Sequence, residues 1–353
     1  MSDIGAAPAV GWTAAALVLL CAIAVLLSMF VVRRVIRLAI MDVPGGRSAH
    51  DRPIPRGGGA GMVAAVLLGL PAAVALLRGR PLGWHASPVQ AAILIETAVV
   101  LLAGVSWLDD VRELGYREKL AAQLAAAALT LGAVMVATPV LPPARLLLPG
   151  IAIGFCWVVF VTNAMNFIDG LNGLAAGTTA LCGLFAAFAG WTAGDSLAVA
   201  VALPMSAGLL GFLPFNYPKA RIFLGDVGSQ VCGLLAALLG LLLLADARPA
   251  GCILVPLVLA GILWDVTFTL CRRALARERL TQAHRGHLYQ VASRTGLPAA
   301  WVTAIHWMFA FWGGMLGLAV RPVPAVMLVL LPQLAWTLVV RHRATRAGLQ
   351  QWS

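Results

Sequence analysis

Two adjacent carboxylates, Asp109 and Asp110, end a long apolar run of this sequence. Unpaired acids at the C-terminus of a helix repel each other and oppose the helix dipole. The pair could therefore serve a divalent cation or a phosphate-bearing nucleophile. The alternative is a solvated acid pair whose charge Arg112, Arg117 and Lys119 balance.

A second stretch, "NAMNFIDG", spaces Asn163, Asn166 and Asp169 three residues apart. This spacing places the three side chains along one side of a helix end. Two amides and a carboxylate together suit sugar hydroxyls, a nucleotide or the water shell of a metal ion. The alternative is a polar finish to a membrane span, although such ends more often carry Trp, Tyr, Lys or Arg.

A third stretch, "FLGDVGS", sets Asp226 between Gly225 and Gly228, just before another apolar run. A tight glycine loop with a carboxylate could hold a metal–diphosphate through its backbone amides and its acid. An Asp at this point could also be no more than the N-cap of the following helix.

Two basic stretches could meet phosphates. "AHRGHLYQ" contains His284, Arg285 and His287, which could donate to phosphate oxygens. A basic loop attracted to anionic lipid headgroups is the alternative. "PIPRGGG" carries Arg56 and is either a simple turn or a glycine loop that approaches a phosphate.

The elements that must position these side chains are membrane helices. Of the 353 residues, 61% are hydrophobic and only 11% are charged, too few charges for a soluble domain of this size. Apolar runs of about 20 residues without period-two alternation predict transmembrane helices rather than strands. We therefore expect an all-α polytopic integral membrane protein with a single domain over residues 1–353. About eleven spans are predicted, at 11–36, 59–77, 89–107, 119–138, 149–166, 173–192, 197–214, 228–245, 251–271, 299–320 and 324–340.

The basic residues orient these spans. All but five of the 25 lysines and arginines fall on one side of the predicted membrane. Because basic loops stay in the cytoplasm, the N-terminus is predicted outside and the C-terminus inside. The polar motifs fall on the same cytoplasmic side, in loops near 37–58, 108–118, 163–173, 215–228 and 272–298.

Composition argues against two other kinds of protein. The formal net charge is +11, but no soluble basic module carries it, so no nucleic acid partner is expected. The six cysteines lie within or at the ends of apolar spans and show no CxxC spacing. Neither a disulfide framework nor a zinc site is therefore predicted.

Five motifs, in order, resemble the polyprenyl-phosphate N-acetylhexosamine-1-phosphate transferase family (glycosyltransferase family 4). They are "RSAHDRPIPRGGG", "LDD", "NAMNFIDGLNGLAAG", "FNYPKARIFLGDVGS" and "AHRGHLYQ", within residues 42–290. The resemblance implies transfer of an N-acetyl sugar 1-phosphate from a UDP-sugar to undecaprenyl phosphate, with release of UMP. It also implies Mg²⁺, or alternatively Mn²⁺, and a multi-pass enzyme of the bacterial inner (cytoplasmic) membrane whose active site faces the cytoplasm. The lipid bilayer and a second copy of the chain in a homodimer are the other implied partners.

The same resemblance assigns roles to residues. It implies catalytic roles for Asp109, Asp110, Asp169 and His287, and a metal-binding role for Asp226. The implied substrate-binding residues are Asn163, Asn166, Asn172, Asn216, Phe223, Arg56, His284 and Arg285. Asp109 or Asp110 could take a proton from the lipid phosphate as a general base, or could form an aspartyl-phosphate.

Two departures from the family pattern indicate which branch of the family this sequence resembles. Asn172 stands where many relatives carry a second carboxylate, in "DGLDGL". His287 is followed by Leu288, Tyr289 and Gln290, so only the first histidine of the family's histidine motif is present. This form resembles the branch that starts O-antigen or other surface polysaccharides rather than the peptidoglycan branch.

A secondary transporter is the rival hypothesis. Glu96 and Asp265 lie within predicted spans, where a transporter would use such acids as coupling sites. A transporter should also show polar residues near the midplane and a repeat between its halves. The polar motifs gather at one face instead, and no internal repeat is evident, so the transferase is favoured.

Overall fold

The computed structural model describes residues 6–38, 41–42, 53–78, 87–112, 114–138, 144–245, 253–280, 282 and 284–349. The described chain is a helical bundle with one short antiparallel strand pair, β1 (Met41–Asp42) with β2 (Ile54–Pro55). The helices are α1 Ala6–Leu38, α2 Ala60–Leu77, α3 Pro88–Arg112, α4 Tyr116–Ala137, α5 Ala144–Ile168, α6 Leu174–Ala193, α7 Ser196–Asn216, α8 Gly225–Ala245, α9 Leu254–Val258, α10 Ala260–Leu275, α11 Leu288–Arg294, α12 Ala299–Ala319 and α13 Pro322–Arg346.

Among the described residues, ten helices are long and apolar enough to cross a membrane. Lipid offers no hydrogen bonds to the backbone, so each apolar run must satisfy its own N–H and C=O groups as a helix. The predicted all-α polytopic membrane class is confirmed.

The ninth predicted span, 251–271, differs from a single straight helix. Its described part consists of α9 and α10, separated at Leu259 (φ −83°, ψ 2°). Backbone hydrogen bonds from Leu259 to Val255 and from Leu263 to Leu259 continue across the break. The helix axis is therefore interrupted while the direction of the chain is kept, and the order of the predicted spans is unchanged.

Small residues allow the helices to approach closely. A Cβ on Gly233 of α8 would lie 2.5 Å from the Cα of Thr162 on α5, and one on Gly208 of α7 would lie 2.9 Å from the Cα of Met62 on α2. Membrane helices pack mainly through such contacts, because lipid removes the hydrophobic driving force between them. As a result α8 lies almost entirely inside the bundle, whereas most of α1 faces outward.

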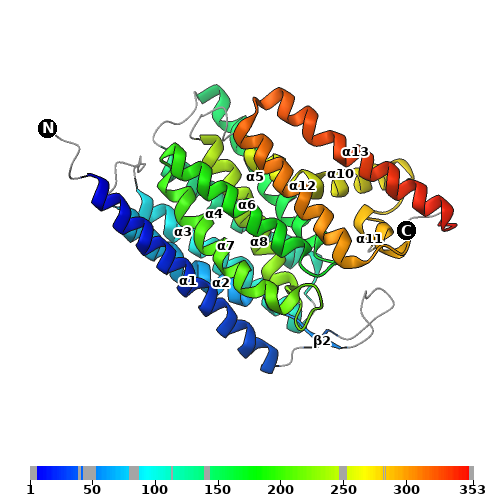
Figure 1. The fold of residues 1–353 in the computed structure, drawn as a ribbon, viewed down its shortest axis with the longest axis horizontal. Coiled ribbons are helices and arrows are strands. Elements are labelled where there is room, and N and C mark those ends of the chain that lie inside the picture. The colour runs from blue at the N-terminus through cyan, green and yellow to red at the C-terminus, as the bar shows by residue number, and fades with distance from the viewer. Residues whose placement is uncertain are drawn as a thin grey trace.

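The connections that carry the sequence motifs meet at one end of the bundle. Loop 53–59, the end of α3, the end of α5 and the start of α8 contact one another there through the hydrogen bonds described below. The start of α1 and the end of α13 lie at opposite ends of the bundle (Figure 1). The predicted placement of the N-terminus outside and the C-terminus inside stays a prediction.

Candidate active site

Two glycine-rich loops, at 57–59 and 223–228, are hydrogen-bonded to each other at this end. The N–H of Gly58 donates to the carbonyl of Phe223, and that of Gly59 donates to the carbonyl of Leu224, both at 2.9 Å. A Cβ on Gly59 would lie 2.1 Å from the Cα of Gly228, so a larger residue would force the loops apart. The glycines therefore serve this backbone contact, and a contact of Phe223 with substrate stays a prediction.

Four carboxylates lie close to this contact between the loops. We call Asp109, Asp110, Asp169 and Asp226 the acid cluster. Asp109 and Asp110 end α3, Asp169 follows α5, and Asp226 lies in the first turn of α8. Burial, together with the negative charges of Asp226 and Asp110, raises the pKa of Asp169 well above its usual value. The sequence motifs therefore bring like charges together, as a site for a cation requires.

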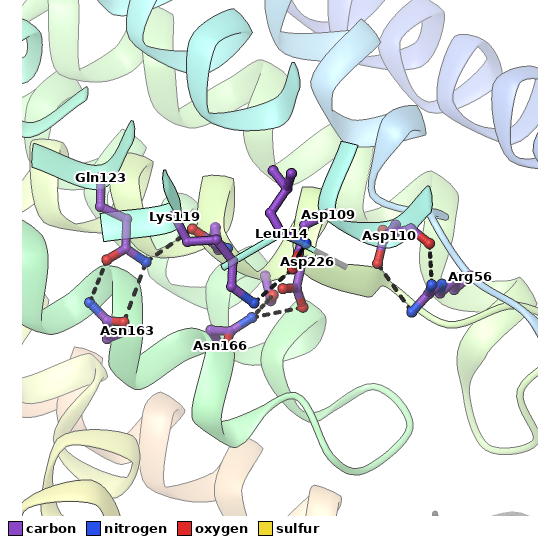
Figure 2. A network of polar contacts seen from close by, with 11 residues as sticks. Arg56, Asp109, Asp110, Leu114, Lys119, Gln123, Asn163, Asn166 and Asp226 are labelled. Carbon is purple, nitrogen blue, oxygen red and sulfur yellow. Dashed lines mark hydrogen bonds and ion pairs between the residues drawn. The ribbon is translucent and has the colours of Figure 1, made fainter. Parts of the chain in front are cut away.

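Two cations partly balance the cluster (Figure 2). Lys119 donates from Nζ to Oδ2 of Asp109 at 2.8 Å, while the N–H of Leu114 donates to Oδ1 at 2.8 Å. Arg56 lies beside Asp110, with Nη1 3.6 Å from Oδ1 and a hydrogen bond to the Asp110 carbonyl. The sequence predicts for Lys119 only a role in balancing the acid pair, whereas in the structure it lies in the first turn of α4 and bonds to Asp109 directly.

Asn166 joins α5 to α8. Its amide nitrogen donates to Oδ1 of Asp226 and to Oγ of Ser229, each at 3.0 Å (Figure 2). Because α8 begins at Gly225, Asp226 lies within the helix rather than before it, and its carboxylate is held from another helix. Asn166 therefore orients the acid predicted to bind metal.

A layer of three amides lies next to the cluster, toward the membrane interior. Asn163 and Gln123 exchange hydrogen bonds, from Asn163 Nδ2 to Gln123 Oε1 at 3.0 Å and from Gln123 Nε2 to Asn163 Oδ1 at 3.3 Å. Gln123 also donates to Gln230 Oε1 at 3.1 Å. Asn163 is thus engaged with α4, and its contact with substrate stays a prediction. The sequence analysis missed Gln123 and Gln230, although amides within apolar spans are a recognisable signal.

Asn172 and Asn216 fasten the loop that follows Asp169. Asn216, which is 4% exposed, donates to the carbonyl of Ile222 at 2.9 Å and accepts from the N–H of Gly173. Asn172 donates to the carbonyl of Pro218 at 3.1 Å. Both amides have backbone partners in the structure, so their predicted substrate contacts stay predictions.

The segment His284–Gln290, here called the histidine loop, lies against the end of α5. The hydroxyl of Tyr289 donates to the carbonyl of Phe167 at 3.0 Å, which places the loop next to the turn that carries Asp169. The rings of His284 and His287 stack with centroids 4.9 Å apart. Arg285 belongs to the same loop, where its carbonyl accepts from Arg294.

The environment of His284 keeps its ring neutral near pH 7. Burial, with the positive charges of Arg273 and Arg272, lowers the pKa of His284 from 6.5 to about 4. Nδ1 of His284 accepts from the N–H of Gly286 at 3.1 Å. The proton of the neutral ring therefore lies on Nε2, which makes His284 a neutral donor.

The two acids of the transporter hypothesis lie apart. Asp265 binds the histidine loop, with its Oδ1 2.9 Å from the N of Leu288. Glu96 lies on α3 and lines a cavity of about 140 Å³ with Pro71 of α2 and with Arg78, the C-cap residue of that helix. The residues that line the Glu96 cavity do not include Asp265.

The acid cluster suits a metal that binds together with its substrate. Within the described ranges, no group of three or more His, Cys, Asp or Glu side chains is arranged to hold a metal on its own. Mg²⁺ needs no such group, because it keeps several waters and binds one or two carboxylates plus substrate phosphates. The hard oxygen donors and the excess of acids over Lys119 and Arg56 fit that ion.

Comparison with known proteins agrees with this geometry. Residues 92–244 match the model of glycosyl transferase family 4, a segment that includes the whole acid cluster. Over this segment the chain is similar to that family. The family match thus covers α3 to α8, the helices that hold the carboxylates and the amide layer.

Individual relatives carry related names. A probable undecaprenyl-phosphate N-acetylglucosaminyl 1-phosphate transferase of Bacillus subtilis is 29% identical over 280 residues, which is 76% of this chain and 74% of that protein. A decaprenyl-phosphate N-acetylglucosaminephosphotransferase of Mycobacterium tuberculosis is 34% identical over 57% of this chain and 53% of its own. A phospho-N-acetylmuramoyl-pentapeptide-transferase of Moorella thermoacetica is 34% identical over 46% and 49%. The chain thus spans about half the length of the last two relatives.

Proposed function

We propose that this protein transfers an N-acetyl sugar 1-phosphate from a UDP-sugar to undecaprenyl phosphate and releases UMP. The observation that carries the proposal is the acid cluster with Lys119, built where five motif-bearing connections meet. The names of the Bacillus and mycobacterial relatives support a polyprenyl phosphate acceptor. The segment from His287 to Gln290 favours initiation of O-antigen or another surface polysaccharide.

The charges of the site explain how two anions could react there. An oxygen of the lipid phosphate attacks the β-phosphorus of the UDP-sugar, and the bond from that phosphorus to the bridging oxygen breaks, so UMP leaves with the electron pair. Mg²⁺, or Mn²⁺, held by Asp226, would neutralise the diphosphate and the leaving UMP. Asn166 fixes the Asp226 carboxylate, and Arg56, His284 and Arg285 supply further donors to phosphate.

Hydrogen bonding separates the roles of the two adjacent acids. Both oxygens of Asp109 accept donors at 2.8 Å, from Lys119 and from Leu114. Asp109 therefore holds Lys119 in the cluster, and we assign proton acceptance from the lipid phosphate to Asp110. Trapping with acid during turnover tests the other route, since an aspartyl-phosphate would carry label from the donor.

We propose that the site faces the cytoplasm at the bacterial inner membrane, where soluble UDP-sugars are available; the bias of lysine and arginine toward the loops on that side supports this placement. Reporter fusions after Arg346 and after Ala193 test this placement. A cytoplasmic signal from the first and a periplasmic signal from the second are expected. The reverse pattern contradicts it.

The decisive experiment is UMP release by purified protein in detergent. Undecaprenyl phosphate is supplied with a panel of UDP-N-acetyl sugars, in Mg²⁺ or in EDTA. We expect UMP from one donor only when lipid and metal are both present, and a large loss in Asp226→Asn. Asp195→Asn is the matched control, because Asp195 is a buried carboxylate that accepts from Ala198 N at the start of α7. UMP release that persists in EDTA or without lipid would reject the proposal.

A further inference from the structure

Asp265 of α10 is buried beneath the histidine loop and is 1% exposed. Its Oδ1 accepts from the N–H of Leu288 and its Oδ2 from the N–H of Tyr289, both at 2.9 Å. The hydroxyl of Thr269 adds a longer contact of 3.3 Å to Oδ1. A buried carboxylate is costly unless donors satisfy it, and here the donors come from the loop that begins α11. Asp265 therefore fixes where this loop lies.

The same carboxylate reaches the imidazole of His287. Nδ1 of His287 lies 3.0 Å from Oδ1 of Asp265. A carboxylate that already receives two backbone N–H groups acts as an acceptor, so Nδ1 carries the proton and donates. In the neutral ring Nε2 is then the acceptor, because the partner of one ring nitrogen determines the state of the other.

Neighbouring rings hold the imidazole in place. The centroid of the His287 ring lies 4.9 Å from that of His284, 5.8 Å from that of Tyr289 and 6.2 Å from that of Phe167. Tyr289 is itself bonded to the carbonyl of Phe167 at the end of α5. The orientation of His287 is thus tied to the helix end that leads into Asp169. Asp265 contacts the His287 ring at Nδ1.

We infer that Asp265 is a positioning residue, which holds Nδ1–H of His287 so that Nε2 is the ring atom that meets a phosphate oxygen of the substrates. The lone pair of Nε2 accepts from a protonated oxygen, and the imidazolium donates from Nε2 to an ionised one. The inference rests on the proposed function only for the identity of the group that Nε2 meets. It gives a role to an intramembrane acid that a transporter would have used for coupling.

The tautomer can be measured without any substrate. Full-length protein in detergent, labelled with ¹⁵N-histidine, is recorded at a pH where the ring is neutral, and His287→Gln identifies the signal. We expect a protonated, pyrrole-like Nδ1 and a pyridine-like Nε2 for His287. A proton on Nε2 would overturn the inference, whether or not the protein releases UMP.

Kinetics test the positioning role through non-additivity. Asp265→Asn should lower kcat about 10–100-fold, the usual effect of losing the partner of a functional histidine, with KM for the UDP-sugar within about threefold. The double variant with His287→Gln should lose no more than His287→Gln alone, because the two residues act as one unit. Additive losses, or a change confined to KM, would contradict the inference.

Controls separate positioning from a loss of folding and from a failure of the proposed reaction. Asp195→Asn removes a comparable buried carboxylate (3% exposed) far from the site and should keep kcat. If Asp265→Asn does not fold, the ¹⁵N spectrum of the unaltered protein still decides. If the unaltered protein releases no UMP from any donor, the proposed function fails while the spectrum continues to test the role of Asp265.

Discussion

The acid cluster and the histidine loop both bury aspartates, but they treat the negative charge in opposite ways. Asp265 is satisfied by N–H and hydroxyl donors from its own chain. The four acids of the cluster lie close to one another, with Lys119 and Arg56 as their paired cations. A buried carboxylate whose oxygens are all hydrogen-bonded within the protein stabilises the local structure. A group of carboxylates with excess negative charge can instead bind a cationic ligand. The comparison therefore assigns positioning to one region and substrate chemistry to the other.

The largest expected effect separates the two regions by stability. Asp226→Asn should lower activity by about 10²–10³-fold, comparable to the loss of a main electrostatic group. It should leave the melting temperature unchanged or higher, because one of four mutually repelling charges is removed. Asp265→Asn should lower the melting temperature, since its donors lose an anionic partner. UMP release measures the loss of activity, and thermal unfolding measures the change in melting temperature, in each variant. A lower melting temperature of Asp226→Asn would contradict the proposed difference between the two regions.

Lys119→Met should have the next largest effect. The ammonium group bonds to Asp109 at 2.8 Å and its charge also acts on Asp226 and Asp110. Its loss increases the repulsion that the substrate phosphates meet, so kcat/KM should fall about 10–100-fold, as for other residues that support a site. Lys119→Arg should recover part of the activity. Unchanged kinetics in Lys119→Met would show that the cation serves only the fold.

Asn163→Leu should change stability more than catalysis. The substitution leaves Gln123 without its reciprocal amide partner, at a cost of about 1 kcal/mol for a hydrogen bond between membrane helices. KM for the UDP-sugar should stay within about threefold, because the amide faces α4 in the structure. A large rise in KM would instead restore the substrate-binding role that the sequence predicts for Asn163.

The smallest effect concerns acid stability. The pKa of His284 is about 4 in the folded protein, against 6.5 for the ordinary ring, chiefly because burial disfavours the charged form. The unfolded chain therefore binds this proton first as the pH falls, and the stabilising contribution of the neutral ring is lost from about pH 6.5 down to about pH 4. His284→Gln should reduce the drop in melting temperature between neutral and acid pH. An equal drop in both proteins would contradict the neutral ring.

The sequence and the structure agree where lipid dictates the outcome. Apolar runs must become helices, so the spans could be predicted, and the spacing of Asn163, Asn166 and Asp169 placed all three at the end of one helix. The interruption at Leu259 was not predicted, although Pro256 and Gly261 lie on either side of it in the sequence. The partners of Asn163 and Asn216 were also unpredictable, since an amide in a motif has the same letter whether it meets substrate or backbone.

Asp265 shows the other limit of sequence reasoning. Its position within an apolar span marks it as functional, but its partners lie more than twenty residues further along the chain, at His287, Leu288 and Tyr289. Only the packing of α10 against the histidine loop reveals that the acid orients a ring. A charge within a span therefore identifies an important residue without identifying its task.

The central claim is that the phosphate next to the sugar moves with it, and the fate of that phosphate tests it most directly. The protein is incubated with undecaprenyl phosphate, Mg²⁺ and the active UDP-sugar carrying ³²P at the β-position. We predict label in the organic-extractable lipid and one UMP released for each labelled lipid. Label recovered as UDP, with unlabelled lipid product, would show transfer of the sugar alone and would contradict the account.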